Sequence, residues 1–167
     1  NQNVSAAQNE QAAEFLKNSG NCLFEENKGQ FHDENNNPVP FVLFKATQGN
    51  MHFYITTEGI RYYFFESEEE EEENYEGEHK KEVEWCRMDV NLKGGQIKKE
   101  NIETENGSDD YVNYFLGHCP QGIMNVKKYA KVTIIAVYPG IDWIFYSNEK
   151  GIKYEFIVHP GADPSVI

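Results

Sequence analysis

The stretch that decides the fold is residues 141–158, which read IDWIFYSNEKGIKYEFIV. Its first half has apolar side chains on both faces, which is typical of a central strand. In its second half, Ile152, Tyr154, Phe156 and Val158 share one face and Lys153 and Glu155 lie on the other, and this pattern predicts a half-buried strand. The polar run 147–151 between the two halves is expected to close a hairpin.

Similar short runs continue outward from this hairpin towards the N-terminus. Aromatic and β-branched residues, which favour strands, gather in ranges separated by Gly, Pro and Asn: 41–44, 51–57, 60–65, 82–92, 96–105, 111–117 and 129–138. Glu58-Gly59 and Asn106-Gly107 are predicted turns, and a switch of the apolar face near Arg87 suggests a bulge. The predicted fold class is therefore mainly β, an antiparallel β-sandwich or barrel-like domain with a short N-terminal helix.

Composition limits the classes of partner. The chain has 167 residues and a formal net charge of −13, which argues against binding to nucleic acid or to an anionic membrane. Its 11 Phe, 10 Tyr and 2 Trp argue against full disorder, and no apolar run approaches the roughly 20 residues of a spanning helix. We therefore predict no membrane insertion and no nucleic-acid partner.

Two segments differ from the predicted strands. Residues 1–20 are rich in Asn, Gln and Ala and read as a leader or short helix, so the β domain is placed at 21–167. Within it, residues 66–80 contain six consecutive glutamates, Glu68 to Glu73, and are expected to form a solvated acidic loop. Because the sequence begins at Asn1, we expect a processed product or a fragment of a longer chain.

Three cysteines, Cys22, Cys86 and Cys119, are far apart and include no C-x-x-C pair. Three buried thiols are the first interpretation, and one disulfide with a free thiol stays open. The spacing gives little support to a structural zinc site, and no metal or cofactor is predicted.

Three blocks of sequence resemble a known family. The first is Phe24-Glu25-Glu26-Asn27-Lys28-Gly29-Gln30, which is similar to an F-x-E-N-x-G-Q signature. The second, residues 111–117, resembles a Y-x-N-Y-F-x-G block through Asn113, Tyr114, Phe115 and Gly117. The third resembles a closing Y-P-G-I-D…P-G-A-D-P run through Tyr138, Pro139, Gly140, Asp142, Pro160, Gly161, Asp163 and Pro164.

The family that these blocks resemble is an uncharacterised domain family covering about residues 24–167. It occurs at the mature N-terminus of large exported proteins of Bacteroidota and related bacteria. Such proteins continue with SBBP-type β-propeller repeats, immunoglobulin-like repeats or a gliding-motility-associated C-terminal domain. The resemblance implies an extracellular or cell-surface module whose signal peptide has been removed, exported by the type IX route, with no known catalytic activity. Because that family usually continues past Ile167 with another short strand, the resemblance also implies a chain that is truncated at its C-terminus. The motif residues themselves are expected to be structural: Asn27 and Gly29 set a turn and Gln30 bonds the backbone across it.

Candidate catalytic groups are scattered. Five carboxylates could supply the pair that glycoside hydrolysis needs, but nothing in the sequence fixes their separation: Glu25, Glu26, Asp142, Glu155 and Asp163. His118-Cys119 is an adjacent pair whose side chains would point in opposite directions on a strand. Zinc-hydrolase, nucleophile-elbow and phosphate-loop motifs do not occur in the sequence.

The sequence therefore favours a non-enzymatic extracellular module that acts as a structural or interaction domain of a larger adhesin-like protein. Its partners would be other domains of the same precursor or a surface protein, bound by adding a strand to an open sheet edge. The first alternative is a carbohydrate-binding module that uses two exposed aromatic residues on one face, drawn from Tyr62, Tyr63, Trp85, Trp143 and Tyr146. Trp143, between Ile141 and Phe145, is expected in the core. A surface hydrolase is the second alternative.

Overall fold

The computed structural model describes residues 22–66 and 84–167. It contains nine strands: β1 (Phe24–Glu26), β2 (Val42–Gln48), β3 (Met51–Thr56), β4 (Gly59–Phe65), β5 (Trp85–Asn91), β6 (Ile102–Leu116), β7 (Cys119–Tyr138), β8 (Ile141–Asn148) and β9 (Gly151–Val158). Two single 3₁₀ turns, η1 (Lys99–Asn101) and η2 (Pro164–Val166), complete the described elements. The predicted N-terminal helix and the glutamate run lie outside the described residues.

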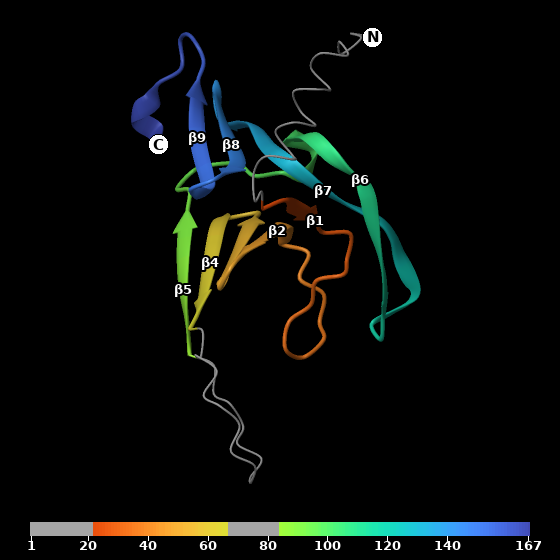
Figure 1. Cartoon of the computed structure of the whole chain (residues 1–167). Coiled ribbons are helices and arrows are strands. Elements are labelled where there is room, and N and C mark those ends of the chain that lie inside the picture. Colours follow the sequence, from red (N-terminus) through yellow and green to blue (C-terminus); the bar gives the residue numbers. More distant parts are fainter. Residues whose placement is uncertain (1–21, 67–83) are drawn as a thin grey trace, which may run out of the picture.

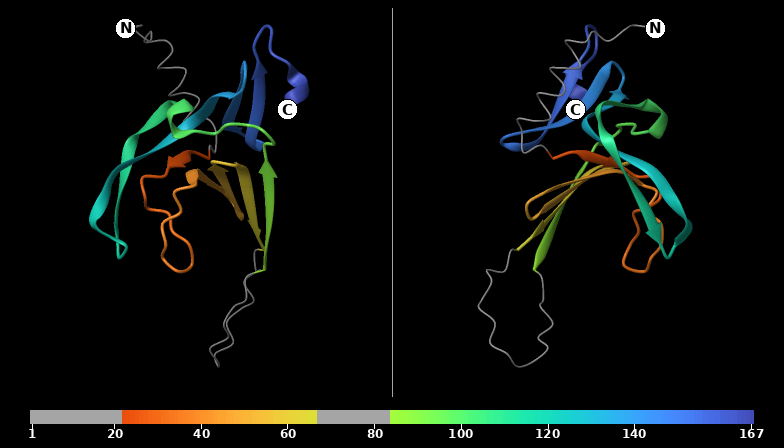
Figure 2. Two further views of the ribbon diagram at one scale, coloured as in Figure 1. Left: turned by 180° about the vertical axis from the view of Figure 1, so that it is seen from behind. Right: turned by 45° about the vertical axis from the view of Figure 1, so that its right-hand side comes forward.

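All nine strands belong to one antiparallel sheet in the order β5-β4-β3-β2-β1-β7-β8-β9, and β6 pairs with β7. The 20-residue strand β7 organises the sheet, because β1 and β8 pair with successive parts of it while β6 runs beside it. The sheet curls into a half-barrel, with β7 arching from the β6 hairpin to β8 (Figure 1 and Figure 2). The prediction of a mainly β antiparallel fold is confirmed, and its architecture is this curled sheet.

The curl encloses one hydrophobic core. Phe24, Phe53, Trp143 and Phe145 are fully buried, and the ring centroids of Phe53 on β3 and Phe145 on β8 lie 5.9 Å apart. The two halves of the sheet, on either side of β1, therefore pack against each other through aromatic side chains, which contribute the largest buried areas.

Residues 141–158 fold as their sequence pattern predicts. β8 is central, paired with β7 on one side and β9 on the other, and Ile141, Trp143 and Phe145 are fully buried. β9 is half-buried at the end of the sheet, and the ring of Phe156 stacks on Trp143 at 5.3 Å. The interpretation of Trp143 as a core residue is confirmed.

The predicted hairpin around Glu58-Gly59 is confirmed as β3–β4. The buried hydroxyl of Thr56 accepts hydrogen bonds from the backbone N–H groups of Glu58 and Gly59, both at 3.2 Å, and donates to the Gly59 carbonyl at 3.1 Å. A Cβ on Gly59 would lie 2.0 Å from the Val90 carbonyl oxygen, so only glycine lets β5 pair this closely.

Two predictions about local irregularity are wrong. Asn106-Gly107 does not reverse the chain: Asn106 has φ 53° and sits inside β6, where the register with β7 shifts after Gly107. The left-handed conformation that Asn tolerates serves a bulge here and not a turn. The predicted bulge near Arg87 is absent from the described pairing, since β4 and β5 stay in register from Gly59–Asn91 to Phe65–Trp85.

No helix in the described ranges has the length and apolar character needed to cross a bilayer.

Candidate functional site

The first motif block forms a tight turn after β1. The Asn27 side chain donates to the carbonyls of Val42 (2.7 Å) and Val39 (3.2 Å) and accepts from the Gly29 N–H (2.8 Å). The Gln30 amide is buried, donates to the Glu26 carbonyl at 2.7 Å and accepts from the Lys28 N–H at 2.7 Å. Gly29 has φ 110°, which favours glycine. These bonds give Asn27, Gly29 and Gln30 structural roles.

Glu25 ties three strands together beside this turn. Its carboxylate accepts from the Tyr114 hydroxyl (2.6 Å) and the Gln30 amide (3.1 Å) and lies 3.5 Å from the Lys128 ammonium. The pKa of Tyr114 is raised to about 12, mainly by burial and secondly by its hydrogen bond to Glu25. Burial also lowers the pKa of Lys45, which is paired with Glu25 across β1 and β2.

A cavity of about 530 Å³ opens beside Glu25, and its lining includes Gln30, Lys45, Tyr114 and Lys128. A second cavity of about 440 Å³, which Glu26 and Asn27 help to line, lies on another side of the same turn. Glu25 is already satisfied by Tyr114, Gln30 and Lys128, and these contacts hold β1, β6 and β7 in place.

The closing motif also forms a hydrogen bond with the backbone of a neighbouring strand. Asp142 accepts from the Ala136 N–H at 2.8 Å and lies 2.7 Å from Nε2 of His159. Burial alone would raise the pKa of Asp142, but these two contacts hold it below its usual value. Ala136 has φ 49° at a register shift between β7 and β8, so Asp142 secures a bulge in the long strand.

The remaining motif residues lie in β6, at the end of β7, in turns and at η2. The Tyr138 hydroxyl donates to the Lys93 carbonyl (3.2 Å), and Asn113 accepts from the Asn125 N–H (2.9 Å). Asp163 caps η2 through the Ser165 N–H at 2.9 Å. Phe115 on β6 is 75% exposed. The other motif residues lie in turns or at the start of η2: Gly117, Pro139, Gly140, Pro160, Gly161 and Pro164.

The candidate catalytic groups do not converge. Glu25 lines one cavity and Glu26 the other, and neither cavity is lined by Asp142, Glu155 or Asp163. Glu155 instead accepts from the Tyr146 hydroxyl at 2.5 Å. Among the described residues no three His, Cys, Asp or Glu side chains form a group suited to a metal ion.

His118 and Cys119 lie at the β6–β7 turn. Both approach the Gly29 carbonyl, with His118 Nε2 at 3.3 Å and Cys119 Sγ at 3.8 Å, so the expectation of opposite directions is wrong at this turn. All three cysteines are free. Only Cys22 is buried; Cys119 is partly exposed and Cys86 is exposed, which corrects the expectation of three buried thiols.

The five candidate platform aromatics divide between the faces of the sheet. Trp143 is buried, Tyr62 packs on Phe53 at 5.0 Å, and Tyr146 is engaged by Glu155. Tyr63 and Trp85 instead share the outer face of β4 and β5, with ring centroids 5.7 Å apart.

Tyr54 on β3 extends this pair, 5.6 Å from Tyr63. We call Tyr54, Tyr63 and Trp85 the aromatic row. Tyr54 is not among the five aromatic residues proposed from the sequence, although its alternation with Phe53 and Ile55 predicts that it lies opposite the core.

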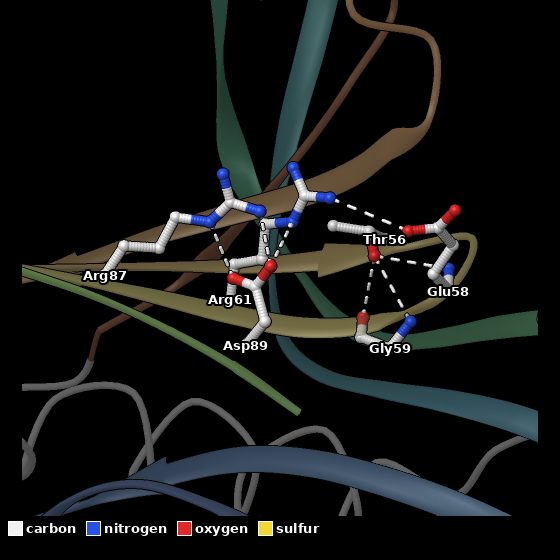
Figure 3. A network of polar contacts seen from close by, with 6 residues as sticks. All are labelled: Thr56, Glu58, Gly59, Arg61, Arg87 and Asp89. Carbon is white, nitrogen blue, oxygen red and sulfur yellow. Dashed lines mark hydrogen bonds and ion pairs between the residues drawn. The ribbon is translucent and has the colours of Figure 1, made fainter. Parts of the chain in front are cut away.

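Charged groups border the aromatic row. Arg87 donates through Nε to Asp89 at 2.8 Å, Arg61 lies 3.5 Å from the same carboxylate, and Arg61 also approaches Glu58 at 3.7 Å (Figure 3). We call Arg61, Arg87 and Asp89 the polar network. The hydrogen bond from Arg87 holds the pKa of Asp89 below its usual value. The Arg87 guanidinium also lies 6.0 Å from the Tyr63 ring, which joins the two groups.

The end of the sheet at β9 has a second exposed feature. Tyr154, 43% exposed, packs on Trp143 with ring centroids 5.7 Å apart, and Phe64 and Met88, 40% and 46% exposed, lie beside Tyr62 on β4 and β5. We call Phe64, Met88 and Tyr154 the apolar rim. In the described part of the chain no strand pairs with the outer edge of β9.

The chain belongs to the family described as Domain of unknown function (DUF7948), whose family model matches residues 24–167. This confirms the expected membership of a family of unknown function over those residues, and no enzyme family is identified. Comparisons with curated proteins and with solved structures found no match.

Proposed function

We propose that this chain is a non-enzymatic interaction module of a larger exported surface protein, and that it binds an extended polypeptide segment along β9. The observation that carries the proposal is the outer edge of this eight-residue strand, with which no strand within residues 22–66 and 84–167 pairs. An exposed row of backbone N–H and C=O groups is a template for another strand.

The register of β9 determines which backbone groups are available. The His159 N–H donates to the Gly140 carbonyl at 2.9 Å, and hydrogen-bonded pairs alternate along an antiparallel ladder. The backbone groups that point away from β8 therefore belong to Ile152, Tyr154, Phe156 and Val158. These are also the residues whose side chains face the core side.

The same geometry specifies the occupant. A strand added to β9 would direct alternate side chains towards the apolar rim and Val158, and the others towards solvent beside Lys153 and Glu155. An extended segment with alternating apolar and polar residues is the expected partner, supplied by another domain of the precursor or by a surface protein. Burial of the rim would add hydrophobic free energy to the backbone hydrogen bonds.

The lack of convergence among the candidate carboxylates supports a binding role over a catalytic one. The family resemblance supports export and a place beside repeat or sorting domains. An antibody against this chain should label intact cells of the source organism, and labelling only after permeabilisation would contradict the exported location.

Strand addition can be tested with peptides selected from a random displayed library on the immobilised full chain. We expect the selected peptides to alternate apolar and polar residues. On binding, they should slow amide hydrogen exchange at Ile152, Tyr154, Phe156 and Val158, since only these amides gain new acceptors.

Two neighbouring substitutions provide a matched comparison. Val158 and Ile157 are 41% and 39% exposed but lie on opposite faces of β9. V158D should weaken peptide binding at least about tenfold, whereas I157D should change it less than about threefold. Equal losses in both variants, or protection of amides elsewhere, would refute pairing along β9.

A further inference from the structure

We propose that the outer face of β3, β4 and β5 binds a soluble polysaccharide chain, with the aromatic row stacking on sugar rings and the polar network bonding their hydroxyls. This site lies away from the outer edge of β9 and goes beyond the interaction module proposed above. It rests on three features of the outer face: its exposure, the spacing and tilt of its rings, and the charges beside them.

The aromatic row is exposed although the core has ample aromatic material. Trp85 is 59% exposed, while the other tryptophan, Trp143, is fully buried. Tyr63 and Tyr54 are partly exposed beside it on adjacent strands. Large apolar side chains gathered on one face cost solubility, and such patches commonly mark binding surfaces. A ligand with apolar faces of its own would therefore fit the aromatic row.

The row crosses the strands in regular steps. The centroid distances are 5.6 Å from Tyr54 to Tyr63 and 5.7 Å from Tyr63 to Trp85, because each ring stands on the next strand of the sheet. A chain of linked sugar rings laid across β3, β4 and β5 would meet one aromatic side chain after another. A monosaccharide could contact only part of this row.

The tilt of the rings selects the form of the chain. The Tyr63 and Trp85 planes meet at 38° and the Tyr54 and Tyr63 planes at 80°, so a flat crystalline surface cannot lie against the faces of all three rings. A single polysaccharide chain whose successive rings are rotated about its axis can follow them. We therefore assign the site to soluble, twisted chains.

The polar network matches the hydroxyl edge of a sugar. Asp89 supplies carboxylate oxygens as acceptors, and Arg61 and Arg87 supply guanidinium donors (Figure 3). Strand alternation places them on the same face as the aromatic row, because Arg61 is two residues from Tyr63 on β4 and Arg87 and Asp89 follow Trp85 at steps of two on β5. Hydrogen bonds to charged groups are stronger than those between neutral groups. Lys45, 5.8 Å from the Tyr54 ring, places another donor near the other end. Apolar faces interleaved with donors and acceptors suit a polyhydroxylated ring, and the net charge of −13 disfavours nucleic acid and anionic membranes.

The test is affinity electrophoresis of the full chain in gels containing soluble starch, laminarin, xylan or hydroxyethyl cellulose, followed by fluorescence titration. We expect at least one polysaccharide to retard the chain. The same polysaccharide should shift the tryptophan emission, which must come from Trp85 because Trp143 is buried. No retardation by any of the four, or binding to crystalline cellulose alone, would overturn the proposal.

Variants separate the site from a general effect on the surface. W85A and Y63A should each weaken binding at least about tenfold, and D89N should weaken it by a smaller factor. Y111A is the matched control, because Tyr111 is 57% exposed on the edge strand β6, and it should leave binding unchanged. If Y111A reduced binding as much as W85A, or if W85A bound normally while folded by circular dichroism, the site would be wrong.

Discussion

At the scale of single residues, Gln30 shows how one buried side chain fixes the conformation of a short motif. Its buried amide satisfies two backbone groups of the turn after β1 and contacts Glu25. Q30A would leave the Lys28 N–H and the Glu26 carbonyl without these partners in a largely buried place. We expect a loss of about 2–3 kcal/mol in the free energy of unfolding, measured by urea denaturation.

Gln121 provides the comparison, because it is exposed at the beginning of β7. Q121A should change the free energy of unfolding by less than about 0.5 kcal/mol. If the Q30A chain were as stable as the Q121A chain, water would replace the lost hydrogen bonds and Gln30 would not stabilise the fold.

At the scale of the element, β7 depends on a local break in its own regularity. Ala136 has φ 49°, a conformation that costs a non-glycine residue roughly 1–2 kcal/mol, and its N–H is held by Asp142. A136G should therefore raise the free energy of unfolding by about 0.5–1 kcal/mol, since the exposed side chain makes little contact. Thermal and urea denaturation would measure the gain.

The same strand contains the matched control. Ala130 is buried at 2% exposure in the regular part of β7, so A130G should lower stability by about 1 kcal/mol. Opposite signs for the two alanine-to-glycine changes are the expected result. Destabilisation of similar size in both variants would mean that Asp142, and not the backbone conformation, governs this bulge.

At the scale of the whole molecule, one core joins both ends of the sheet, which predicts cooperative unfolding. Cys22 and Trp143 belong to that core, and burial raises the pKa of the Cys22 thiol. Exposed Cys86 should react fastest with a thiol reagent and Cys119 more slowly. Cys22 should react only at urea concentrations that also shift the Trp143 fluorescence.

Chains that retain one cysteine each would assign the reaction rates. Labelling of Cys22 well before the change in Trp143 fluorescence would show that the segment entering β1 opens by itself, and that the molecule has at least two units of unfolding.

The limits of prediction from sequence follow from the same elements. β8 was predictable because both of its faces are apolar, and Trp143 was placed correctly for that reason. The first part of β7 was missed because Pro120, Gly122 and polar residues hide its strand character. The neighbourhood of Tyr63 and Trp85 could not be predicted, since the long insertion between β4 and β5 leaves their register open.

The arrangement around β7 also sets an order of folding. The strands β2 to β5 pair only with their neighbours in sequence, so they can assemble as soon as residue 91 has been synthesised. Phe24, in contrast, finds Tyr129 across more than a hundred intervening residues. The first strand of the sheet therefore gains its second neighbour only after β7 has formed. We expect closure of this long loop to be the slow step of folding, because it has the largest entropy cost of the pairings in the sheet.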